Sequence, residues 1–583
     1  MNYPVWYLPT IGGAFFIALI AITHVFVSHF AVGGGLYLIF AERLGLRRNN
    51  PAILDFTKKH AKFFILITLV FGSMTGVGIW FIIALASAGG TSLLIHNFVF
   101  GWAIEWVFFL VEIVAAFVYF YTFGKMKSGT HQAVGWVYFG AAWASLFIIN
   151  GILSFMLSPG AWLESGNFWI GFFNPTFWPS LFFRTFVATM LAGVYAFLTC
   201  SFLRDGELKN TMTRFSGWWV LVSFLASIPF GYWYLTALPA PARDLVAGKS
   251  PTIQMALDYG LYAIGVVIIL SLILTLIRPA LNVKPVAFVV MMAAFIFLGA
   301  FEWTREAARR PFVVNQVIYS NGLTAADLEK AGADGFLASA KWTRVKEVTP
   351  ENLQQAGADI FRHQCYACHT VNGWNNDIVP LTESMSYRAM VSYIKTIHEK
   401  RYFMPPFAGT DAEAEALAAY LVGGLHGKEM VMASPEGESM ADQGARIFEE
   451  NCSACHGYDA IAPSLAGWDA DRIREALDHL SQLNEMMEDF TGTAAEKEAL
   501  TQFLLTGGRV PPDGAVLFEE NCSMCHGLAE IQPGMSGWDR VKIRQSLDNL
   551  SAINEMMADY DGSTSEKDAL ADYLAAASKA GDQ

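Results

Sequence analysis

Charged residues are scarce in the part of this chain that precedes Thr343. Asp, Glu, Lys and Arg make up 16% of the 583 residues, and about three quarters of the 52 acidic ones follow Thr343. An ordinary solvated domain needs a charged surface, so this scarcity excludes a solvated domain in the first part of the chain. The chain also lacks a basic excess, with a net charge of −13, and we therefore expect no nucleic-acid partner. The sequence divides into an apolar body and an acidic tail.

The apolar body consists of long hydrophobic runs, each long enough to cross a bilayer as a helix. They predict an all-α membrane bundle within residues 1–315, embedded in membrane lipid. The predicted spans are Ile11 to Phe40, Lys62 to Ala88, His96 to Phe123, Ala133 to Leu157, Pro179 to Leu203, Gly217 to Leu238, Ala256 to Ile277 and Pro285 to Glu302.

Basic residues are distributed unevenly among the loops that connect these runs. The loops after the first, third, fifth and seventh spans carry most of them, including Arg47, Lys125, Arg204 and Arg278. By the positive-inside rule those loops are cytoplasmic, so both termini lie outside. We expect a protein of the bacterial inner membrane with its tail on the periplasmic side. The first span lacks a basic flank and is interpreted as retained, not as a cleaved signal peptide.

Cysteine is also rare, and six of the seven cysteines occur in one motif. The motif is C-x-x-C-H, in which two thiols form thioethers to a porphyrin and the histidine binds its iron. Its three copies predict three covalent haem c groups. They comprise Cys365, Cys368 and His369, then Cys452, Cys455 and His456, then Cys522, Cys525 and His526.

The three motifs lie in an internal repeat that resembles class I cytochrome c. Gly444 to Cys452 recurs as Gly514 to Cys522, and Gly357 to Phe361 opens a looser copy. The resemblance implies a methionine ligand after each motif, which raises the reduction potential. The candidates are Met404, Met487 and Met557, with Met486 and Met556 left open as alternatives for the last two. We expect a linker at 316–348 and cytochrome domains at 349–428, 441–508 and 513–578.

Ionisable residues inside the hydrophobic runs are the next candidates, because charge at membrane depth is costly and usually functional. Glu105 and Glu112 are seven residues apart and so share one helix face. The remaining ones are His24, His29, Arg184, Glu302 and Glu306. Under the predicted orientation, one pocket in the outer half of the membrane collects His24, Glu105, Arg184 and Glu306. Histidine with carboxylates around an open position suits an iron that binds a small molecule.

Over nearly its whole length the body resembles subunit I of the cytochrome bd quinol oxidases. The likeness rests on Thr23-His24-Val-Phe-Val, on Ala103-Ile104-Glu105 followed by Glu112, and on Glu302-Trp-Thr-Arg-Glu306 continuing to Arg309. The resemblance implies one or two non-covalent haems, of type b and, for the second, d or b. It implies iron ligation by His24 and Glu306, with Glu105 a further ligand candidate, and roles for Glu112 and Arg309.

The chain departs from that family at two sites. Arg184 stands where the family has a histidine for its low-spin haem, and the quinol-binding loop has shrunk to Pro239 to Thr252. These departures predict that the low-spin haem and the quinol site are absent, and that the three c haems provide the electron entry instead. Arg184 is then expected to pair with a haem propionate or with Glu306.

Three functions are compatible with the sequence, and the least favoured is a membrane anchor for a triheme cytochrome, because an anchor gains nothing from the cost of Glu105, Glu112 and Glu306. The first is a terminal oxidase that takes electrons from a soluble cytochrome c-type donor, reduces O2 or NO, and receives protons along Glu105 and Glu112. The second is an electron conduit between periplasmic cytochromes and a quinone or partner subunit. A further membrane subunit is expected in either case, since members of the resembled family work with one.

Overall fold

Helices dominate the part of the chain that the structure describes. The computed structural model describes residues 6–430, 440–453, 455–484, 487–506, 514–522, 527–553, 557, 560, 562 and 564–580. Within them the strands are one antiparallel pair, β1 (Phe312–Val314) and β2 (Ile318–Tyr319). The predicted all-α class is confirmed. The chain divides into two compact units, residues 1–383 with 394–427 and residues 384–393 with 428–583.

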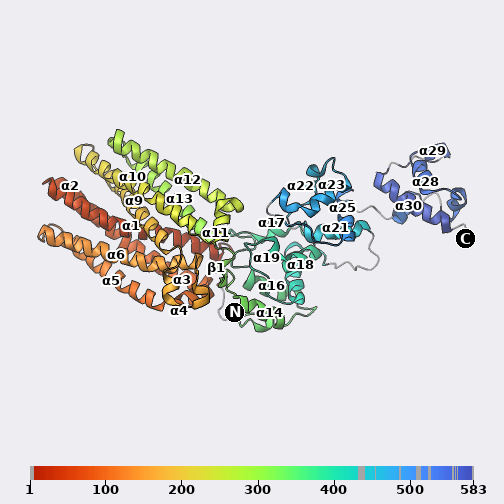
Figure 1. The fold of residues 1–583 in the computed structure, drawn as a ribbon, viewed down its shortest axis with the longest axis horizontal. Helices are drawn as coiled ribbons and strands as arrows, with labels where there is room; N and C mark the ends of the chain where they lie inside the picture. Colours follow the sequence, from red (N-terminus) through yellow and green to blue (C-terminus); the bar gives the residue numbers. More distant parts are fainter. Residues whose placement is uncertain are drawn as a thin grey trace. The chain divides into compact units, whose positions relative to one another are not determined.

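The first unit contains a bundle of long helices (Figure 1). Eight helical segments of the described chain have the length and composition to cross a membrane, as the sequence predicts. They are formed by α1 (Gly13–Arg47), α2 (Pro51–Ile65) continued by the π-helical turn η1 (Leu66–Phe71) into α3 (Gly72–Ala86), α5 (Val99–Thr122), α6 (Ser128–Leu157), α9 (Phe177–Cys200), α10 (Glu207–Thr236), α12 (Pro251–Leu272) with η3 (Ile273–Ile277), and α13 (Lys284–Ala307).

Short helices occupy the connections of this unit. They are α4 (Ala88–Asn97), α7 (Trp162–Ser165), α8 (Phe168–Phe172), α11 (Ala240–Asp244), η2 (Leu245–Lys249), η4 (Pro279–Leu281), α14 (Ala325–Asp334) and α15 (Phe336–Ser339).

The second spanning helix begins earlier than the hydrophobic run predicts, at Pro51 instead of Lys62. The Asn50 side chain accepts hydrogen bonds from the backbone N–H groups of Ala52 and Ile53 at 3.0 and 3.3 Å. An asparagine cap followed by proline at the first helical position favours a helix start. The polar first turns therefore belong to the same helix as the apolar run.

Helix α1 is the centre of the bundle and contacts α2, α3, α6, α9 and α13. Its close approach to α9 depends on Gly33, where a Cβ atom would lie 1.9 Å from the carbonyl oxygen of Ala188. Small residues at such crossings let membrane helices pack tightly. Side chains on either side of this crossing, such as Phe30, Tyr37 and Ile39, are fully buried.

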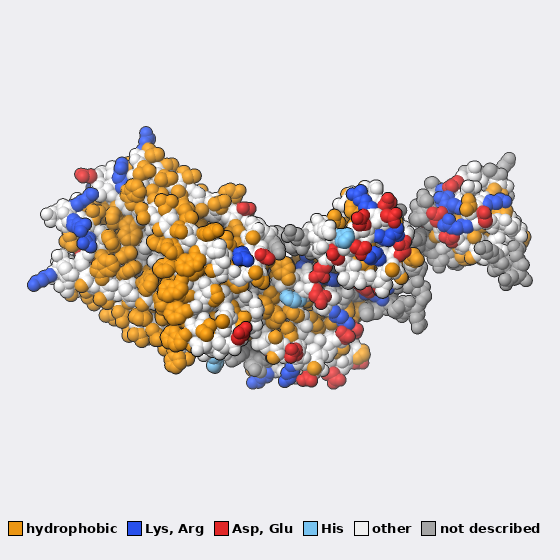
Figure 2. All heavy atoms as spheres, viewed as in Figure 1, with side chains coloured by type: hydrophobic (Ala, Val, Ile, Leu, Met, Phe, Trp, Pro, Cys, Tyr) orange, Lys and Arg blue, Asp and Glu red, His pale blue; other side chains and the backbone are white. Residues whose placement is uncertain are grey.

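Hydrophobic side chains cover much of the face of the bundle seen in Figure 2, and Lys and Arg gather at one end of it. Large apolar residues such as Met74, Val77, Phe100 and Tyr262 are about 70% exposed, at 69%, 70%, 71% and 70%. Such a surface is stable only against lipid or another protein. The first unit is therefore a membrane protein with several spanning helices.

The tail consists of short helices. The first repeat has α16 (Leu353–Gln364), α17 (Ile378–Thr382), α18 (Tyr387–Lys395), α19 (Ile397–Lys400) and α20 (Asp411–Ala418) with η5 (Ala419–Gly424). The second has α21 (Met440–Asn451), α22 (Tyr458–Ile461), η6 (Ala462–Leu465), α23 (Ala470–Asp478), α24 (Leu480–Leu483) and α25 (Ala494–Leu505). The third has α26 (Gly514–Asn521), α27 (Leu528–Ile531), η7 (Gln532–Met535), α28 (Arg540–Leu547), α29 (Leu550–Ile553) and α30 (Thr564–Ala580).

All three repeats share one helix crossing, which explains a glycine that recurs in the sequence. A Cβ atom on Gly357, Gly444 or Gly514 would lie 1.9, 2.1 or 2.3 Å from a carbonyl oxygen of the closing helix. A contact under 3 Å with backbone requires the helices to move apart. The opening and closing helices of each repeat therefore pack backbone to backbone at the same position.

Candidate functional site

The first haem-binding motif follows the end of α16. The backbone N–H groups of Cys368 and His369 donate to the carbonyl of Cys365 at 3.1 and 3.0 Å, which folds the motif into one tight turn. His369 Nδ1 lies 3.0 Å from the carbonyl oxygen of Asn376. A carbonyl only accepts, so Nδ1 carries the proton and Nε2 is free for iron. Burial lowers the pKa of His369, which favours the neutral form that binds a metal.

The loop that contains Met404 is tied to this motif. The side-chain amide of Gln364 donates to the carbonyl of Ala408 at 2.6 Å and accepts from its N–H at 3.0 Å. His398 Nδ1 lies 2.7 Å from the carbonyl of Met404 and fixes the loop at its other end. The residues present therefore fit a c haem with a histidine on one side and a methionine loop near the other.

The second and third repeats keep parts of this arrangement. His456 donates its backbone N–H to the carbonyl of Cys452 at 3.0 Å, as His369 does to Cys365. Met487 and Met557 are half-buried. Cys525 and His526, as well as the alternative ligands Met486 and Met556, lie outside the described residues.

The first motif packs against the membrane body within the first unit. The N–H of Trp374 donates to the carbonyl of Thr10 at 2.7 Å. The rings of Tyr366 and Tyr7 lie 4.4 Å apart, and the Arg362 guanidinium lies 5.3 Å from the Tyr7 ring centre. The segment that precedes α1 therefore provides a docking surface for the haem-binding turn.

A second contact joins this motif to the end of the spanning region. Cys368 Sγ lies 3.8 Å from Ser320 Oγ, and Ser320 follows β2, a short distance after the end of α13. After burial, the positive charge of Arg310 is a further cause of the lowered pKa of His369. The haem-binding turn thus lies beside the segment that follows α13.

The charged residues of α13 form a continuous chain of ion pairs with α9. Arg184 pairs with Glu302 at 2.9 Å, and Glu302 also pairs with Arg305 at 2.9 Å. Arg305 then contacts Glu306 at 2.6 Å, and Glu306 contacts Arg309. Arg184 is 4% exposed, so its guanidinium is held inside the bundle. The sequence offered Glu306 as one possible partner of Arg184. In the structure Arg184 pairs with Glu302 instead, and Arg305 links Glu302 to Glu306.

Three histidines of α1 and α2 share one hydrogen-bond arrangement. His24 Nδ1 lies 3.1 Å from Thr75 Oγ1, whose own proton is donated to backbone carbonyls of the preceding turn. His29 Nδ1 lies 2.8 Å from the carbonyl of Val25, and His60 Nδ1 lies 2.9 Å from Thr199 Oγ1. Each Nδ1 therefore carries the proton, which leaves the Nε2 lone pair available, as in metal-bound histidines.

The surroundings of these histidines differ. His24 is half-buried, and α1 contacts α3 and α13 on either side of it. His29 and His60 are 4% and 1% exposed, and their Nε2 atoms have no hydrogen-bond partner. Four aromatic rings surround His60 with centre distances of 5.1 to 6.1 Å. Of these three histidines, His24 alone is partly exposed and so open to a group bound from the side of the bundle.

Glu306 also fits such a group. Its side chain is 43% exposed although it stands near the end of a spanning helix. Its two oxygens face Arg305 and Arg309, which fix the direction of the carboxylate. The donor set of His24 and Glu306, one neutral imidazole and one oriented carboxylate, suits a haem iron.

Glu105 and Glu112 form their side-chain hydrogen bonds with α6. They are not part of the ion-pair chain of α13. Ser145 donates its hydroxyl to Glu105 at 2.7 Å, and Tyr138 lies 2.9 Å from Glu112. Glu112 is 6% exposed. The seven-residue spacing correctly places both carboxylates on one face of α5.

Two of these residues have roles that sequence reasoning missed. Glu302, which had no assigned role, connects Arg184 to the rest of the ion-pair chain, and Arg305 was not singled out. Their spacing of three on a helix is a visible sign of a pair. The burial of His60 has no such sign, because it depends on packing against α9.

Comparisons with known proteins support the prediction of cytochrome c domains in the tail. Residues 352–421, 439–504 and 510–574 match the family model described as cytochrome C oxidase, cbb3-type, subunit III. The chain is 26% identical over 163 residues to the Cbb3-type cytochrome c oxidase subunit FixP of Sinorhizobium medicae (strain WSM419), which covers 24% of this chain and 54% of that protein. It thus spans about half the length of that curated relative.

A solved structure also resembles the chain. It is the bd oxidase from Geobacillus thermodenitrificans, with a TM-score of 0.45 and 14% sequence identity, covering 53% of this chain and 88% of that chain. The family match covers the tail alone. It implies covalently bound haem c and an electron-transfer role, carried by a membrane protein with several spanning helices. The tail of this chain therefore consists of three segments that are each similar to the cytochrome c domain of cbb3-type oxidase subunit III.

Proposed function

We propose that this chain is a terminal oxidase of the cytochrome bd-like type that takes electrons from a soluble cytochrome c-type donor. The electrons enter the three haem c domains on the periplasmic side and pass to a non-covalent haem site in the membrane body, where O2 or NO is reduced. The acidic tail, whose charge would attract a basic donor, supports this direction of entry. A further membrane subunit completes the complex.

The docking of the first haem-binding motif carries this proposal. Cys368 lies 3.8 Å from Ser320, and Trp374 bonds to Thr10, so the first c domain rests on the body where α13 ends. A mere anchor for a triheme cytochrome would need no such contact. The contact supports electron exchange between this motif and a group held near α13.

The residues of the body have distinct tasks at that group. His24 provides an imidazole nitrogen and Glu306 a carboxylate, while Arg305 and Arg309 orient that carboxylate. Arg184 and Glu302 hold α9 against α13 and fix the position of Arg305. These residues would hold a haem, which would supply the redox chemistry for the reduction of a small molecule. Glu105 and Glu112 hold exchangeable protons on the α5 side.

The experiment is a carbon monoxide difference spectrum of the reduced protein, combined with haem counting. We expect three covalent haems, one or two extractable haems, and a carbon monoxide band that is lost in His24→Ala. His96→Ala is the matched control, because His96 is exposed and contacts only its own helix through Ser92. Extractable haem without any carbon monoxide band would establish the electron conduit instead, and no extractable haem would overturn both.

A second test addresses the docking contact. Replacement of Tyr7 by alanine removes the ring contact with Tyr366 and the contact with Arg362. We expect slower electron transfer from the c haems to the extractable haem, with an unchanged haem count, in rapid-mixing absorbance measurements. Tyr121→Ala, at an exposed position of α5, is the control. Equal rates in the two variants would contradict electron transfer through this contact.

A further inference from the structure

An apolar groove of about 320 Å³ lies between α5 and the part of the second span where α2 continues into η1. The wall on the side of the second span includes Lys62, Leu66 and Val70, and the α5 wall includes Ile113 and Phe117. Leu66, Val70 and Phe117 are 52%, 53% and 41% exposed. We call this space the η1/α5 groove. Its volume falls in the range of sites that hold small molecules.

The two spans that form the walls of the groove are poorly covered by the rest of the chain. Helix α5 packs along α6 and contacts α2. The turn that follows α2 is π-helical, and such turns bend a helix and are frequent at functional sites. The spans Pro51–Ala86 and Val99–Thr122, each with 22% of its apolar stretch buried, are the two least buried of the eight. The groove therefore opens toward the membrane.

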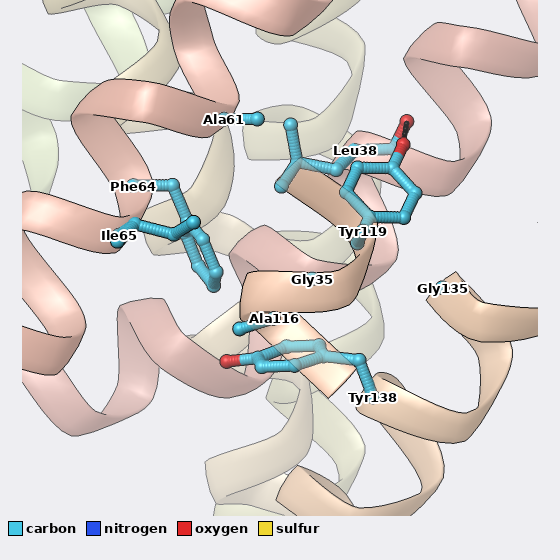
Figure 3. A pocket seen from close by; sticks show the side chains of 9 residues that line it. All are labelled: Gly35, Leu38, Ala61, Phe64, Ile65, Ala116, Tyr119, Gly135 and Tyr138. Atoms are coloured by element: carbon cyan, nitrogen blue, oxygen red, sulfur yellow. Dashed lines mark hydrogen bonds between the residues drawn. The ribbon is translucent and has the colours of Figure 1, made fainter. Parts of the chain in front are cut away.

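The inner side of the groove offers little further space. A second cavity of only about 10 Å³ lies between α1, α2, α5 and α6, and Ile65 lines both spaces. Figure 3 shows Phe64 and Ile65 of α2 across this second cavity from Tyr119 of α5. Its volume is close to the smallest that holds one water molecule, which is too small for a hydrocarbon chain. An occupant of the groove therefore stays on the membrane side of Ile65.

The length of the groove fits one leaflet of a bilayer. Its α5 wall runs from Ile113 to Phe120, which is about 10 Å at 1.5 Å per residue, and α5 ends at Thr122. The hydrocarbon core of a bilayer is about 30 Å thick, so the groove lies within the half next to this helix end. A spanning helix of a partner subunit needs a contact surface through the whole core, whereas an acyl chain needs only its own leaflet. The dimensions therefore favour a lipid chain.

Positive charge is present where the groove approaches the end of the bundle at which Lys and Arg gather (Figure 2). Lys62 is the one charged residue among the described residues that line the groove. Lys58 precedes it by about one helical turn and so shares its face, and Lys125 follows the end of α5; all three are exposed. Within the described part of the chain none of these three lysines forms an ion pair, whereas the neighbouring Lys59 pairs with Asp55 at 2.7 Å. Their charge is therefore available to an anionic ligand.

We propose that the η1/α5 groove binds one anionic phospholipid from the leaflet at the basic end of the bundle. One acyl chain lies along Leu66, Val70 and Phe117. The phosphate meets Lys62, and Lys58 and Lys125 add positive charge around it. Lysines at a membrane surface attract anionic lipids, and the long lysine side chain reaches the headgroup while its stem stays in hydrocarbon. The inference goes beyond the proposed function and does not depend on it, because lipid binding requires no haem in the membrane body.

The first arm of the test measures lipid binding to the delipidated full chain by native mass spectrometry. Dioleoyl phosphatidylglycerol is the anionic probe and dioleoyl phosphatidylcholine the neutral one, and we expect one tight site for the anionic lipid alone. Lys62→Gln should weaken phosphatidylglycerol binding about fivefold, and the triple variant Lys58→Gln/Lys62→Gln/Lys125→Gln on the order of a hundredfold.

Lys284→Gln is the control for the lysine variants. Lys284 begins α13 and lies 4.8 Å from the ring centre of Phe202, away from the groove lining. Its replacement should leave phosphatidylglycerol binding unchanged. Equal weakening in Lys284→Gln and Lys62→Gln would mean that the lipid is attracted by basic charge in general, and this overturns the proposal. Equal affinity of the wild-type protein for the two lipids overturns it as well.

The second arm fills the groove. Val70→Trp places a large ring between the two walls and should abolish the tight phosphatidylglycerol site, with the count of covalent haems unchanged. Val77→Trp is the matched control, because Val77 lies on the same span, is 70% exposed and is not part of the groove lining. Unchanged binding in Val70→Trp overturns the proposal.

A partner subunit is the other occupant that the test distinguishes. If the wild-type protein binds no phosphatidylglycerol tightly, or if a second polypeptide purifies with it and is lost in Val70→Trp, the groove is not a lipid site and the proposal is overturned. The exposed lysine variants decide the question even where Val70→Trp fails to fold. Neither arm uses the carbon monoxide band, so a failure of the proposed function leaves this test intact.

Discussion

The bundle contains two polar systems that differ in how their charges are matched. The α13 system joins Arg184, Arg305 and Arg309 to Glu302 and Glu306, so each carboxylate meets two guanidiniums. Guanidinium groups cannot be deprotonated in proteins, and charge-assisted bonds are strong and directional. The α13 system therefore suits fixed geometry and a constant field.

The second system is the α5/α6 polar ladder, which pairs Glu105 with Ser145, Glu112 with Tyr138 and the Tyr119 carbonyl with His131. It is made of weaker acids and hydroxyl groups. Its carboxylates meet Ser145 and Tyr138, which can donate or accept, and its histidine meets Glu42. A hydroxyl partner tolerates both protonation states of a carboxyl group. The difference between the two systems teaches that one membrane bundle can hold fixed charges and neutral hydrogen-bonding groups on different helix pairs.

The largest expected loss of stability is in the α13 system. Glu302→Gln leaves Arg184 and Arg305 buried without their shared carboxylate. Breaking a buried ion pair in this way destabilises a protein by about 3–5 kcal/mol. Thermal unfolding of the detergent-solubilised protein, followed by circular dichroism, measures the loss.

Lys59→Gln is the control for Glu302→Gln. Lys59 pairs with Asp55 at 2.7 Å on the exposed surface of α2, with side-chain exposures of 73% and 61%. Exposed pairs contribute about 0–1 kcal/mol, so this variant should unfold close to wild type. If both variants lost the same stability, the α13 chain would not be the rigid element that we infer.

An intermediate effect is expected for the middle pair of the ladder. Tyr138→Phe and Glu112→Leu each remove one partner of a buried hydrogen bond, which costs about 1–3 kcal/mol. The double variant should cost less than the sum, because the two residues are in contact. The same unfolding measurement on the four proteins gives the coupling, and strict additivity would contradict the direct bond between them.

Much of this arrangement could be predicted from sequence, but only within single helices. The eight spans follow from hydrophobic length, and the shared face of Glu105 and Glu112 follows from a spacing of seven. The haem motifs are local, as is the recurring glycine at 357, 444 and 514. Each of these features is set by residues close together in the chain.

The partners across helices could not be predicted in the same way. His131, Tyr138 and Ser145 also have a spacing of seven, yet the register of α6 against α5 depends on the loop and on packing. Arg184 meets Glu302 because α9 crosses α13 at one height, which no local pattern specifies. The contact of Cys368 with Ser320 likewise depends on how a soluble domain folds back on the bundle.

The smallest effect is expected at the pair nearest the opposite end of the ladder. Ser145→Ala removes the 2.7 Å hydrogen bond to Glu105, which is half-buried, so water can take the place of the hydroxyl. We expect a loss of about 0.5–1.5 kcal/mol in unfolding free energy. Ser28→Ala is the control, since Ser28 bonds only to a carbonyl of its own helix at 3.2 Å. A loss as large as that of Glu302→Gln would mean that Glu105 is held as a fixed charge, and the contrast between the two systems would no longer hold.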